Sequence, residues 1–189
     1  MSNWFIFNVQ TGHEQKACDF LNKLFNKEES IAFIPQIELT FKSSKLIRKD
    51  LKPMFPGYVF TDSDLEEKKF ITDAYKYTRF SKYIFKLVGN KNSNYMTLSD
   101  EEKKYLLGFC NDRYIAEESK GFIIGDRMYI NSGPLKGKES IIKKIDRHKR
   151  RAEIEIMYLG DIRRVSVSLE IMSKVITQES KDDFNLFSL

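Results

Sequence analysis

Cysteine, histidine and long hydrophobic runs are all scarce in this sequence. The two cysteines, Cys18 and Cys110, allow neither a disulfide framework nor a CxxC zinc site, so we expect reduced, inert thiols. The two histidines, His13 and His148, lie in different predicted domains, which excludes a histidine metal site or a catalytic triad. Apolar runs fall far short of the ~20 residues that span a bilayer. The sequence therefore predicts a cytoplasmic protein without membrane contact.

One segment resembles a phosphate-binding loop, Gly133–Lys138 (GPLKGK). The Walker A pattern needs four residues between its glycines and a Ser or Thr after the Lys, whereas here three intervene and Glu139 follows. We interpret this segment as a turn, because a carboxylate at that place repels a nucleotide. With no other catalytic constellation in the chain, we predict a binding protein that is not an enzyme and has no cofactor or metal.

Basic residues are concentrated in one part of the chain. The 189 residues include 32 Lys and Arg and 27 Asp and Glu, a net charge of +5 at pH 7. Residues 121–175 carry 12 basic and 7 acidic groups, whereas residues 1–120 carry 19 and 17. A basic excess favours a polyanionic partner, and its position places that partner on the later part of the chain.

Residues 1–110 alternate strand and helix patterns. Asn3–Val9 is rich in aromatic and β-branched residues and predicts a buried strand. Thr11–Glu14 has the form of a capping box, followed by an apolar stripe at helical spacing through Phe25. A second capping box, Ser99–Glu102, predicts the last helix. Further strands are expected at 31–35, 38–42, 58–61 and 84–88, a helix at 70–77 and a mobile basic hairpin arm at 42–52. The alternation predicts an α/β sandwich.

The rest of the chain changes to a period of two. Charged and small residues at 111–121 predict a linker. Short strands are then expected at 128–130, 139–145, 152–158, 162–168 and 172–176, separated by turn residues. Strands of this number and length predict a small closed β barrel over 122–176, because closure removes exposed edges. Residues 177–189 are predicted to be a disordered tail.

Several motifs resemble those of the NusG family of transcription factors. Phe55-Pro56-Gly57-Tyr58-Val59-Phe60 matches its FPGYV signature, and Gly125-Asp126-Arg127 followed by Gly133–Gly137 resembles the start of its KOW barrel. Trp4-Phe5, Thr11–Glu14 and Leu98–Glu102 fall where the family has counterparts. The resemblance runs from Trp4 to about Val175. It implies an α+β fold, with a NusG-type amino-terminal α/β sandwich of antiparallel sheet and helices plus a small SH3-like KOW β barrel, in a monomeric bacterial elongation factor that binds RNA polymerase.

The polymerase-binding surface is predicted around the signature motif. Strand alternation directs Tyr58 and Phe60 to one face and Val59 to the other. We therefore expect Val59 to pack beneath the helices and the two rings to be available to a partner; the alternative is that the rings fill the core. Trp4 is expected in the core. The predicted polymerase-binding residues are Phe55, Pro56, Gly57, Tyr58 and Phe60.

The barrel departs from the family in ways that favour RNA. Family barrels that bind Rho or a ribosomal protein carry an apolar aromatic where this chain has Lys138, and a Gly where it has Ser140. Basic loops on a small barrel suit an RNA hairpin, which they would recognise by phosphate contacts and shape. The predicted RNA-binding residues are Lys136, Lys138, Lys143, Lys144, Arg147, His148, Lys149, Arg150, Arg151, Arg163 and Arg164.

This combination resembles the specialised NusG paralogues for operon-specific antitermination, closest to the LoaP group, with the UpxY and RfaH groups still open. RfaH-like members hide the polymerase surface under a helical carboxy-terminal domain. Here β-branched alternation in 152–168 favours a barrel without that switch. We predict an antitermination factor that binds RNA polymerase and a nascent leader RNA hairpin.

Two other functions remain open. One is a general elongation or termination factor whose barrel binds Rho or a ribosomal protein. The other is a ribosome-type structural RNA-binding protein. Non-template DNA also stays open as a partner, although Ser81–Ile84 stands where many family members have a Pro-Gly turn, a departure that weighs against a base-specific contact.

Overall fold

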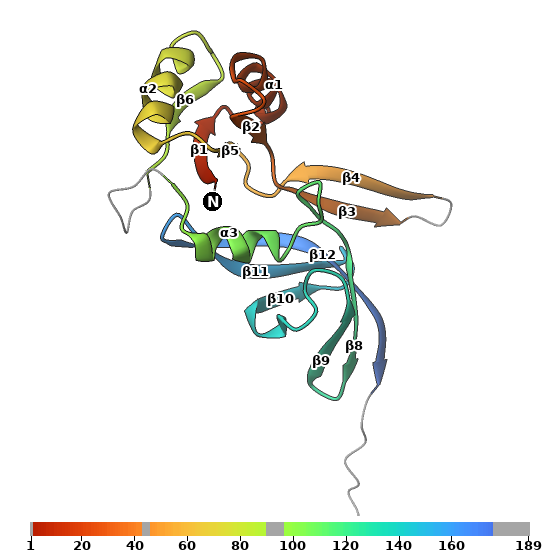
Figure 1. The fold of residues 1–189 in the computed structure, drawn as a ribbon. Coiled ribbons are helices and arrows are strands. Elements are labelled where there is room, and N and C mark those ends of the chain that lie inside the picture. The colour runs from red at the N-terminus through yellow and green to blue at the C-terminus, as the bar shows by residue number, and fades with distance from the viewer. Residues whose placement is uncertain (1, 43–45, 90–96, 176–189) are drawn as a thin grey trace, which may run out of the picture.

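The computed structural model describes residues 2–42, 46–89 and 97–175 (Figure 1). The predicted tail, 177–189, and part of the predicted arm, 43–45, lie outside the described residues. The first elements are β1 (Asn3–Val9), α1 (Glu14–Leu24), β2 (Ser30–Phe33), β3 (Gln36–Lys42), β4 (Ile47–Pro53), β5 (Tyr58–Ser63), α2 (Glu67–Thr78), β6 (Ile84–Leu87) and α3 (Asp100–Leu107). The later elements are β7 (Ile115–Ala116), β8 (Ser119–Ile124), β9 (Arg127–Ser132), the 3₁₀ helix η1 (Glu139–Ile141), β10 (Ile142–Asp146), β11 (Arg151–Tyr158) and β12 (Asp161–Val175). We call β1–α3 the N-terminal unit and β8–β12 the C-terminal unit.

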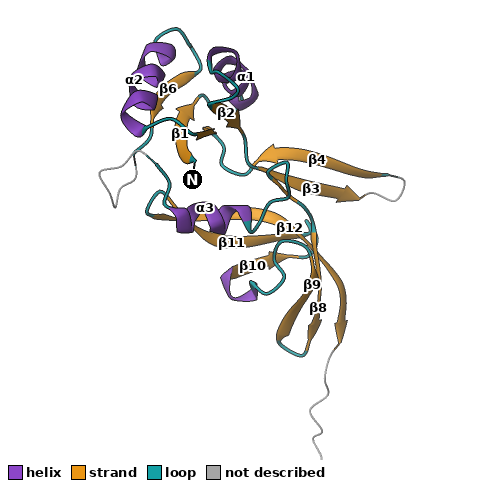
Figure 2. Cartoon of the chain, viewed as in Figure 1, coloured by secondary structure: helices purple, strands orange, loops and turns teal. Residues whose placement is uncertain are grey.

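The N-terminal unit is built on an antiparallel four-stranded sheet in the order β2-β5-β1-β6. Helices α1 and α2 lie together beside this sheet, whereas α3 lies alongside β11 and β12 (Figure 2). Strand β1 occupies a central position because its aromatic run buries well on both faces. Phe5 and Phe7 pack in the cluster under α1 and α2, while Trp4 and Ile6 pack in a second cluster on the opposite face.

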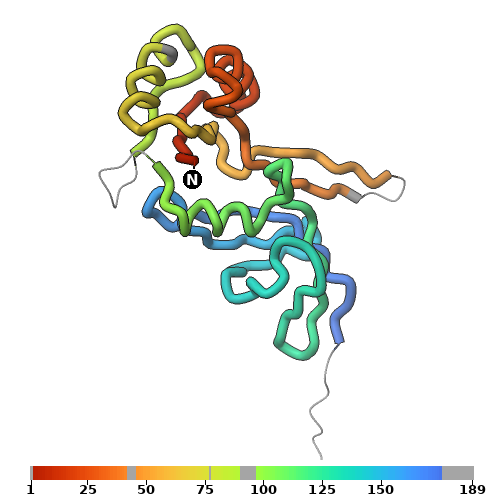
Figure 3. The backbone as a smooth tube through the Cα atoms, in the orientation of Figure 1, coloured from red at the N-terminus to blue at the C-terminus, as the bar shows by residue number. Residues whose placement is uncertain are grey.

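That second cluster joins the two units into one core. It contains Trp4 and Phe60 from the N-terminal sheet together with Ile156, Tyr158 and Val165 from β11 and β12. Both faces of the N-terminal sheet are therefore buried, one by helices and the other by α3 and the C-terminal unit. Figure 3 shows the backbone of the C-terminal unit running close beneath α3. The expected core position of Trp4 is confirmed, with 3% of its surface exposed.

The C-terminal unit is a five-stranded sheet in the order β10-β11-β12-β8-β9. Strand β12 pairs antiparallel with β11 and parallel with β8, so the predicted strand at 162–168 and the described part of the one at 172–176 belong to one continuous strand, Asp161–Val175. Among the described residues no ladder joins β9 to β10. Instead η1 connects these edges, because the Glu139 carboxylate accepts a hydrogen bond from Ile130 N at 3.1 Å. The predicted strands at 128–130 and 152–158 correspond to β9 and β11.

Part of the predicted linker is paired rather than free. Residues Ile115 and Ala116 form β7, which pairs parallel with β3. On its other edge β3 pairs antiparallel with β4, with Gln36 opposite Pro53 at one end and Lys42 opposite Ile47 at the other. The predicted hairpin arm is therefore one side of a two-stranded ribbon. We call β3–β4 the arm; it projects beside the C-terminal unit (Figure 1). An unpaired strand edge readily accepts another strand, which explains why the short segment β7 adds to the arm.

Both cysteines are free thiols. Burial raises the pKa of Cys18 to about 11 and that of Cys110 to about 12, so both stay protonated at neutral pH. Because the thiolate is the reactive form, this burial supports the expectation that both cysteines are unreactive. Over the described ranges, no helix has both the length and the apolar character required to cross a membrane.

Candidate functional site

The turn before β5 is held in place by α1. Gly57 has φ +83°, a conformation that favours glycine, and a Cβ there would lie 3.0 Å from Thr11 Oγ1. The buried Glu14 carboxylate accepts a hydrogen bond from Gly57 N at 2.8 Å, and Gly57 O accepts one from Val9 N at 2.8 Å. The predicted capping box at Thr11–Glu14 is therefore wrong: His13, not Thr11, is the N-cap, its side chain makes no cap bond, and the Glu14 carboxylate is engaged with Gly57 N.

The aromatic rings of the signature motif contact a tyrosine of the C-terminal unit. We call Phe55, Tyr58 and Phe60 the aromatic cluster. The Tyr158 ring stacks on Phe55 with a centroid separation of 4.4 Å and an interplanar angle of 12°. Its centroid lies 5.7 Å from that of Tyr58 and 5.8 Å from that of Phe60. These contacts cover the surface that the sequence assigned to polymerase.

The predicted exposure of this surface is wrong for the observed conformation. Phe55 and Phe60 are buried, Tyr58 is half-buried and Pro56 is exposed. Val59 is fully buried in the cluster beneath the helices, as predicted. Alternation did separate the two faces, but the second face is covered by β11 and β12. The sequence signal for this was the unbroken apolar run of β1, which is typical of a strand buried on both sides.

The tip of the β11–β12 hairpin is strained and buried. Leu159 has φ +51° and Gly160 has φ +73°, the pair of positive values that a tight two-residue hairpin requires. A positive φ at a leucine costs about 1–2 kcal/mol. Only 7% of Leu159 is exposed, so its burial between the units offsets this strain.

Helix α3 contacts the same tip. The predicted capping box at its start is confirmed, because Ser99 Oγ accepts from Glu102 N and Glu102 Oε2 accepts from Ser99 N at 3.0 Å. The other carboxylate oxygen, Glu102 Oε1, accepts a hydrogen bond from Gly160 N at 3.0 Å. One carboxylate thus caps the helix and holds the hairpin.

The Tyr158 hydroxyl is buried without a hydrogen-bond partner. Burial raises the pKa of Tyr158 well above its ordinary value, so the phenol is neutral in this arrangement. An unpaired buried hydroxyl lowers stability. The contact between the units therefore combines favourable ring stacking with a polar group that loses its hydration. We call this arrangement of the two units the closed conformation.

Two of the predicted RNA-binding residues instead contact the N-terminal unit. The Lys138 ammonium lies 5.1 Å from the centroid of the Phe109 ring and donates to Gly108 O at 3.2 Å. The Arg151 guanidinium lies 5.3 Å from the centroid of the Phe41 ring on the arm. Both cations are half-buried rather than free on the surface, which corrects the prediction for this conformation.

Arg147, His148 and Lys149 are exposed at the turn that follows β10, and the half-buried Arg150 and Arg151 come next in the chain. We call Arg147–Arg151 the basic turn. Asp146 accepts a hydrogen bond from Lys149 N at 2.9 Å, which lowers the pKa of its carboxyl. Arg150 has φ +53° and forms an ion pair with Glu170 at 3.2 Å. An open cavity of about 670 Å³ lies beside the turn, and its basic lining consists of Lys144, Arg147, His148 and Arg150.

Other predicted RNA-binding residues lie apart from the basic turn. Lys143 and Arg164 flank the Glu155 carboxylate at 3.4 and 3.2 Å, and the hydrogen bond from Arg164 lowers the pKa of Glu155. Arg163 lies near the opposite end of the β11–β12 hairpin, 4.0 Å from Asp161. Lys136 is exposed in the Gly133–Lys138 segment, which is a turn as predicted. The structure therefore gathers only part of the predicted set at one place.

A second cationic and aromatic surface was missed. Phe80 is 81% exposed and close in sequence to Tyr83, which directly precedes β6. The ammonium groups of Lys16 and Lys82 lie 5.5 and 5.1 Å from the centroid of the Tyr83 ring. His13 stacks on the same ring at 4.7 Å and is half-buried. The alternation of cations and rings in Lys82–Lys86 was the available signal.

Metal binding finds no support in the part of the chain that the structure describes, where no group of three or more His, Cys, Asp or Glu side chains could hold an ion. The arrangement as a whole can bind partners through apolar rings and cations. Its chemistry is that of an interaction protein.

Comparison with known proteins agrees with this assignment. The family model described as "Transcription termination factor nusG" matches residues 2–107. The "Transcription termination/antitermination protein NusG" of Thermus thermophilus is 24% identical over 183 residues, covering 91% of this chain and 97% of that protein. The protein of the same name from Borreliella burgdorferi is 22% identical over 188 residues, covering 91% and 98%.

The fold has a solved counterpart. A structure described as "Domain interaction in Thermotoga maritima NusG" superposes with a TM-score of 0.51 at 24% identity, covering 90% of this chain and 94% of that chain. This likeness confirms the α+β fold. The chain belongs to the NusG family and is a non-enzymatic transcription termination/antitermination factor.

Proposed function

We propose that this chain is a specialised, LoaP-like antitermination factor that binds RNA polymerase through the aromatic cluster and nascent RNA through the basic turn. The observation that carries the proposal is the exposed cation set of the turn, in a unit where Lys138 replaces the aromatic that protein-binding barrels of the family present. Such a factor keeps polymerase elongating past terminators by stabilising one of its conformations. It acts as a monomer in the cytoplasm.

Polymerase binding on this account requires the closed conformation to open. Tyr158 covers Phe55 and Phe60, and both rings would become exposed if the units separated. Contiguous apolar surface flanked by polar residues marks protein interaction sites, and aromatic rings contribute strongly to them. We propose residues 1–110 and 122–176 as the separating domains, with 111–121, which includes β7 and the start of β8, as the segment that connects them and 177–189 as a tail outside both.

RNA binding is supported by the exposure of the turn. Arg147, His148 and Lys149 are exposed, and Lys144 lines the same cavity as Arg147 and His148. Clustered cations neutralise phosphates and release counterions, so the affinity for RNA should fall steeply with salt. A hairpin would be held by its phosphates and recognised by its shape.

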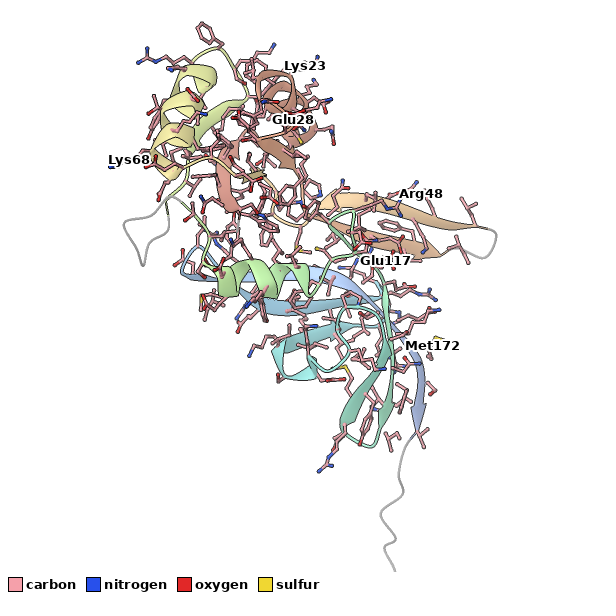
Figure 4. The ribbon with its side chains drawn as sticks, in the orientation of Figure 1. Lys23, Glu28, Arg48, Lys68, Glu117 and Met172 are labelled. Atoms are coloured by element: carbon pink, nitrogen blue, oxygen red, sulfur yellow. The ribbon has the colours of Figure 1, made fainter. Side chains whose placement is uncertain are left out.

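The test reverses charge at two places on the surface. Arg147→Glu with Lys149→Glu should weaken binding of a labelled leader RNA by at least about tenfold in fluorescence anisotropy and abolish read-through of a terminator in transcription assays. The control, Lys23→Glu with Lys68→Glu, makes the same change of net charge on α1 and α2, away from the C-terminal unit (Figure 4). Equal RNA affinity of the two double variants would refute the RNA-binding role.

A second candidate is a general factor whose C-terminal unit binds a protein, such as Rho or a ribosomal protein. Met157 and Ile162 favour it, because they pair across the β11–β12 hairpin and are 50% and 65% exposed. A pull-down comparing wild type with Ile162→Glu separates the functions. A captured protein that is lost with Ile162→Glu, without any change in RNA affinity, supports the second candidate.

Non-template DNA is a further partner of the same antitermination factor. The exposed Phe80 and the cations around Tyr83 provide stacking surface and positive charge, which single-stranded nucleic acid requires. Phe80→Ala should weaken single-stranded DNA binding by about 1–3 kcal/mol if a base stacks there. Unchanged DNA affinity would remove this surface from the mechanism.

A further inference from the structure

Arg151 belongs at once to the basic turn and to the contact between the two units. We propose that RNA binding at the basic turn competes with the closed conformation, so that RNA exposes the aromatic cluster and closure weakens RNA binding. This inference rests on the proposed RNA-binding function and assigns its regulation. Its basis is the set of contacts that Arg151 makes with the arm.

The arm occupies one side of the Arg151 side chain. The guanidinium lies over the Phe41 ring at 5.3 Å, and Nη1 donates to Ser168 Oγ at 3.2 Å. Ser168 Oγ in turn donates to Glu38 O of the arm at 2.6 Å, and Ser168 is almost fully buried. The Arg151 side chain is half-buried, and the resulting loss of hydration lowers its pKa.

The other side of Arg151 faces the cations of the turn. Lys144, Lys149 and Arg151 line a small cavity of about 170 Å³, together with the side chains of Asp146, Glu153 and Ser166. A phosphate bound by all three would lie at the border of the arm and would draw the guanidinium toward solvent. Because Arg151 would then leave Phe41 and Ser168, the phosphate and the arm compete for the same side chain.

Competition of this kind is reciprocal. If RNA binds the open form more tightly, it shifts the population toward that form, and any change that opens the protein tightens RNA binding by the same factor. The contacts at the hairpin tip in the closed conformation are therefore coupled to RNA binding. This holds although Tyr158, the last residue of β11, and the adjacent Leu159 lie at the opposite end of that strand from the basic turn. RNA bound first would prepare the aromatic cluster for polymerase.

The coupling is tested with changes that remove no basic residue. A fluorescein-labelled RNA hairpin, enriched by wild-type protein from a pool with randomised loops, serves as the probe. Phe41→Ala and Tyr158→Ala should each bind it about 5-fold or more tightly than wild type in anisotropy titrations. Tyr75→Ala is the control, because it removes an exposed ring from α2 of the N-terminal unit, distant in sequence from the arm and the hairpin tip. Its RNA affinity should equal that of wild type.

The outcomes separate this inference from the function on which it rests. If the chain enriches no RNA, the RNA-binding function fails and the inference fails with it. If RNA binds wild type, Phe41→Ala and Tyr158→Ala with equal affinity, only the coupling is overturned. Weaker binding by Phe41→Ala would also overturn it, because the arm would then belong to the RNA surface.

A second measurement tests the reverse effect, that of bound RNA on the opening of the closed conformation. The Gly160 amide donates to Glu102 across the contact, so its hydrogen exchange reports opening, whereas the Val9 amide donates to Gly57 within the N-terminal unit. Saturating RNA should accelerate exchange at Gly160 by about 5-fold or more and leave Val9 unchanged. Unaltered exchange at Gly160 with RNA bound would contradict the proposal.

Discussion

The ring of Tyr158 lies nearly parallel to that of Phe55, with 4.4 Å between the ring centroids. A residue of the C-terminal unit thus covers the apolar surface of the turn Phe55–Tyr58, which we call the FPGY turn. Its hydroxyl has no hydrogen-bond partner, although Tyr58, Glu102 and Arg163 are near enough to influence its charge. Stacking favours closure and the unpaired hydroxyl opposes it. A contact that combines a favourable and an unfavourable contribution can keep the protein closed and still open when a partner binds.

Removing that hydroxyl should strengthen closure. Tyr158→Phe keeps the ring and deletes the buried group that loses its hydration, so the closed conformation should gain about 1–3 kcal/mol. Slower hydrogen exchange of the Gly160 amide measures this gain, and weaker binding to RNA polymerase should accompany it. Faster exchange in Tyr158→Phe would indicate that the hydroxyl has a favourable partner in solution.

Closure should weaken in alkaline solution. The pKa of Tyr158 is raised well above 10.0 in the closed conformation, whereas the exposed phenol of the open form ionises near 10. Above pH 10 the open form therefore loses a proton that the closed form must keep, and the open population rises with pH. Small-angle X-ray scattering should show a larger radius of gyration above pH 10 in wild type. Tyr158→Phe should not share this increase; an equal expansion of both proteins would assign the effect to other groups.

Glu102 should contribute to both helix stability and closure. Glu102→Ala removes the acceptor for Ser99 N and for Gly160 N. Loss of the reciprocal cap should lower the free energy of unfolding by about 0.5–2 kcal/mol in urea denaturation. Exchange at Gly160 should also accelerate beyond what this loss explains. Asp100→Ala changes a neighbouring carboxylate of the same helix turn, paired with Lys103, and should leave Gly160 exchange unaltered.

Much of the fold followed from local sequence pattern. Ser99 and Glu102 form the predicted cap because both partners lie within one helical turn. The same pattern failed at Thr11 because Gly57, distant in sequence, competes for the Glu14 carboxylate. Strand β8 forms a local hairpin with β9, but it was missed because its first residues fall in the segment interpreted as a linker and its parallel pairing with β12 is nonlocal.

The candidate site was predictable in composition but not in arrangement. The signature motif identified Phe55 and Phe60, yet their burial depends on Tyr158, which lies about 100 residues later in the chain. Likewise the basic character of Arg151 was evident, whereas its position over Phe41 depends on how the two units pack. Contacts between units are set by complementary surfaces and leave no periodic signal in either segment.

The FPGY turn should lose its geometry without Glu14. Glu14→Ala leaves the buried Gly57 amide without its acceptor and should reduce the free energy of unfolding by about 1–3 kcal/mol. Glu14→Gln retains an acceptor oxygen and should recover most of that loss. Chemical denaturation compares the two variants with wild type. Equal destabilisation by Ala and Gln would show that the charge of Glu14, not its acceptor oxygen, stabilises the turn.

Leu159 should stabilise the closed conformation while its strained backbone destabilises the β11–β12 turn. Leu159→Asn places a residue that tolerates positive φ in the turn, which should relieve about 1 kcal/mol of backbone strain. The same change removes an apolar side chain that is 7% exposed, and burying a leucine contributes about 1.5–3 kcal/mol. The second effect exists only in the closed conformation, so exchange at Gly160 should accelerate while amides in the β11–β12 ladder become better protected. Faster exchange throughout that ladder would instead mean that Leu159 stabilises the C-terminal unit itself.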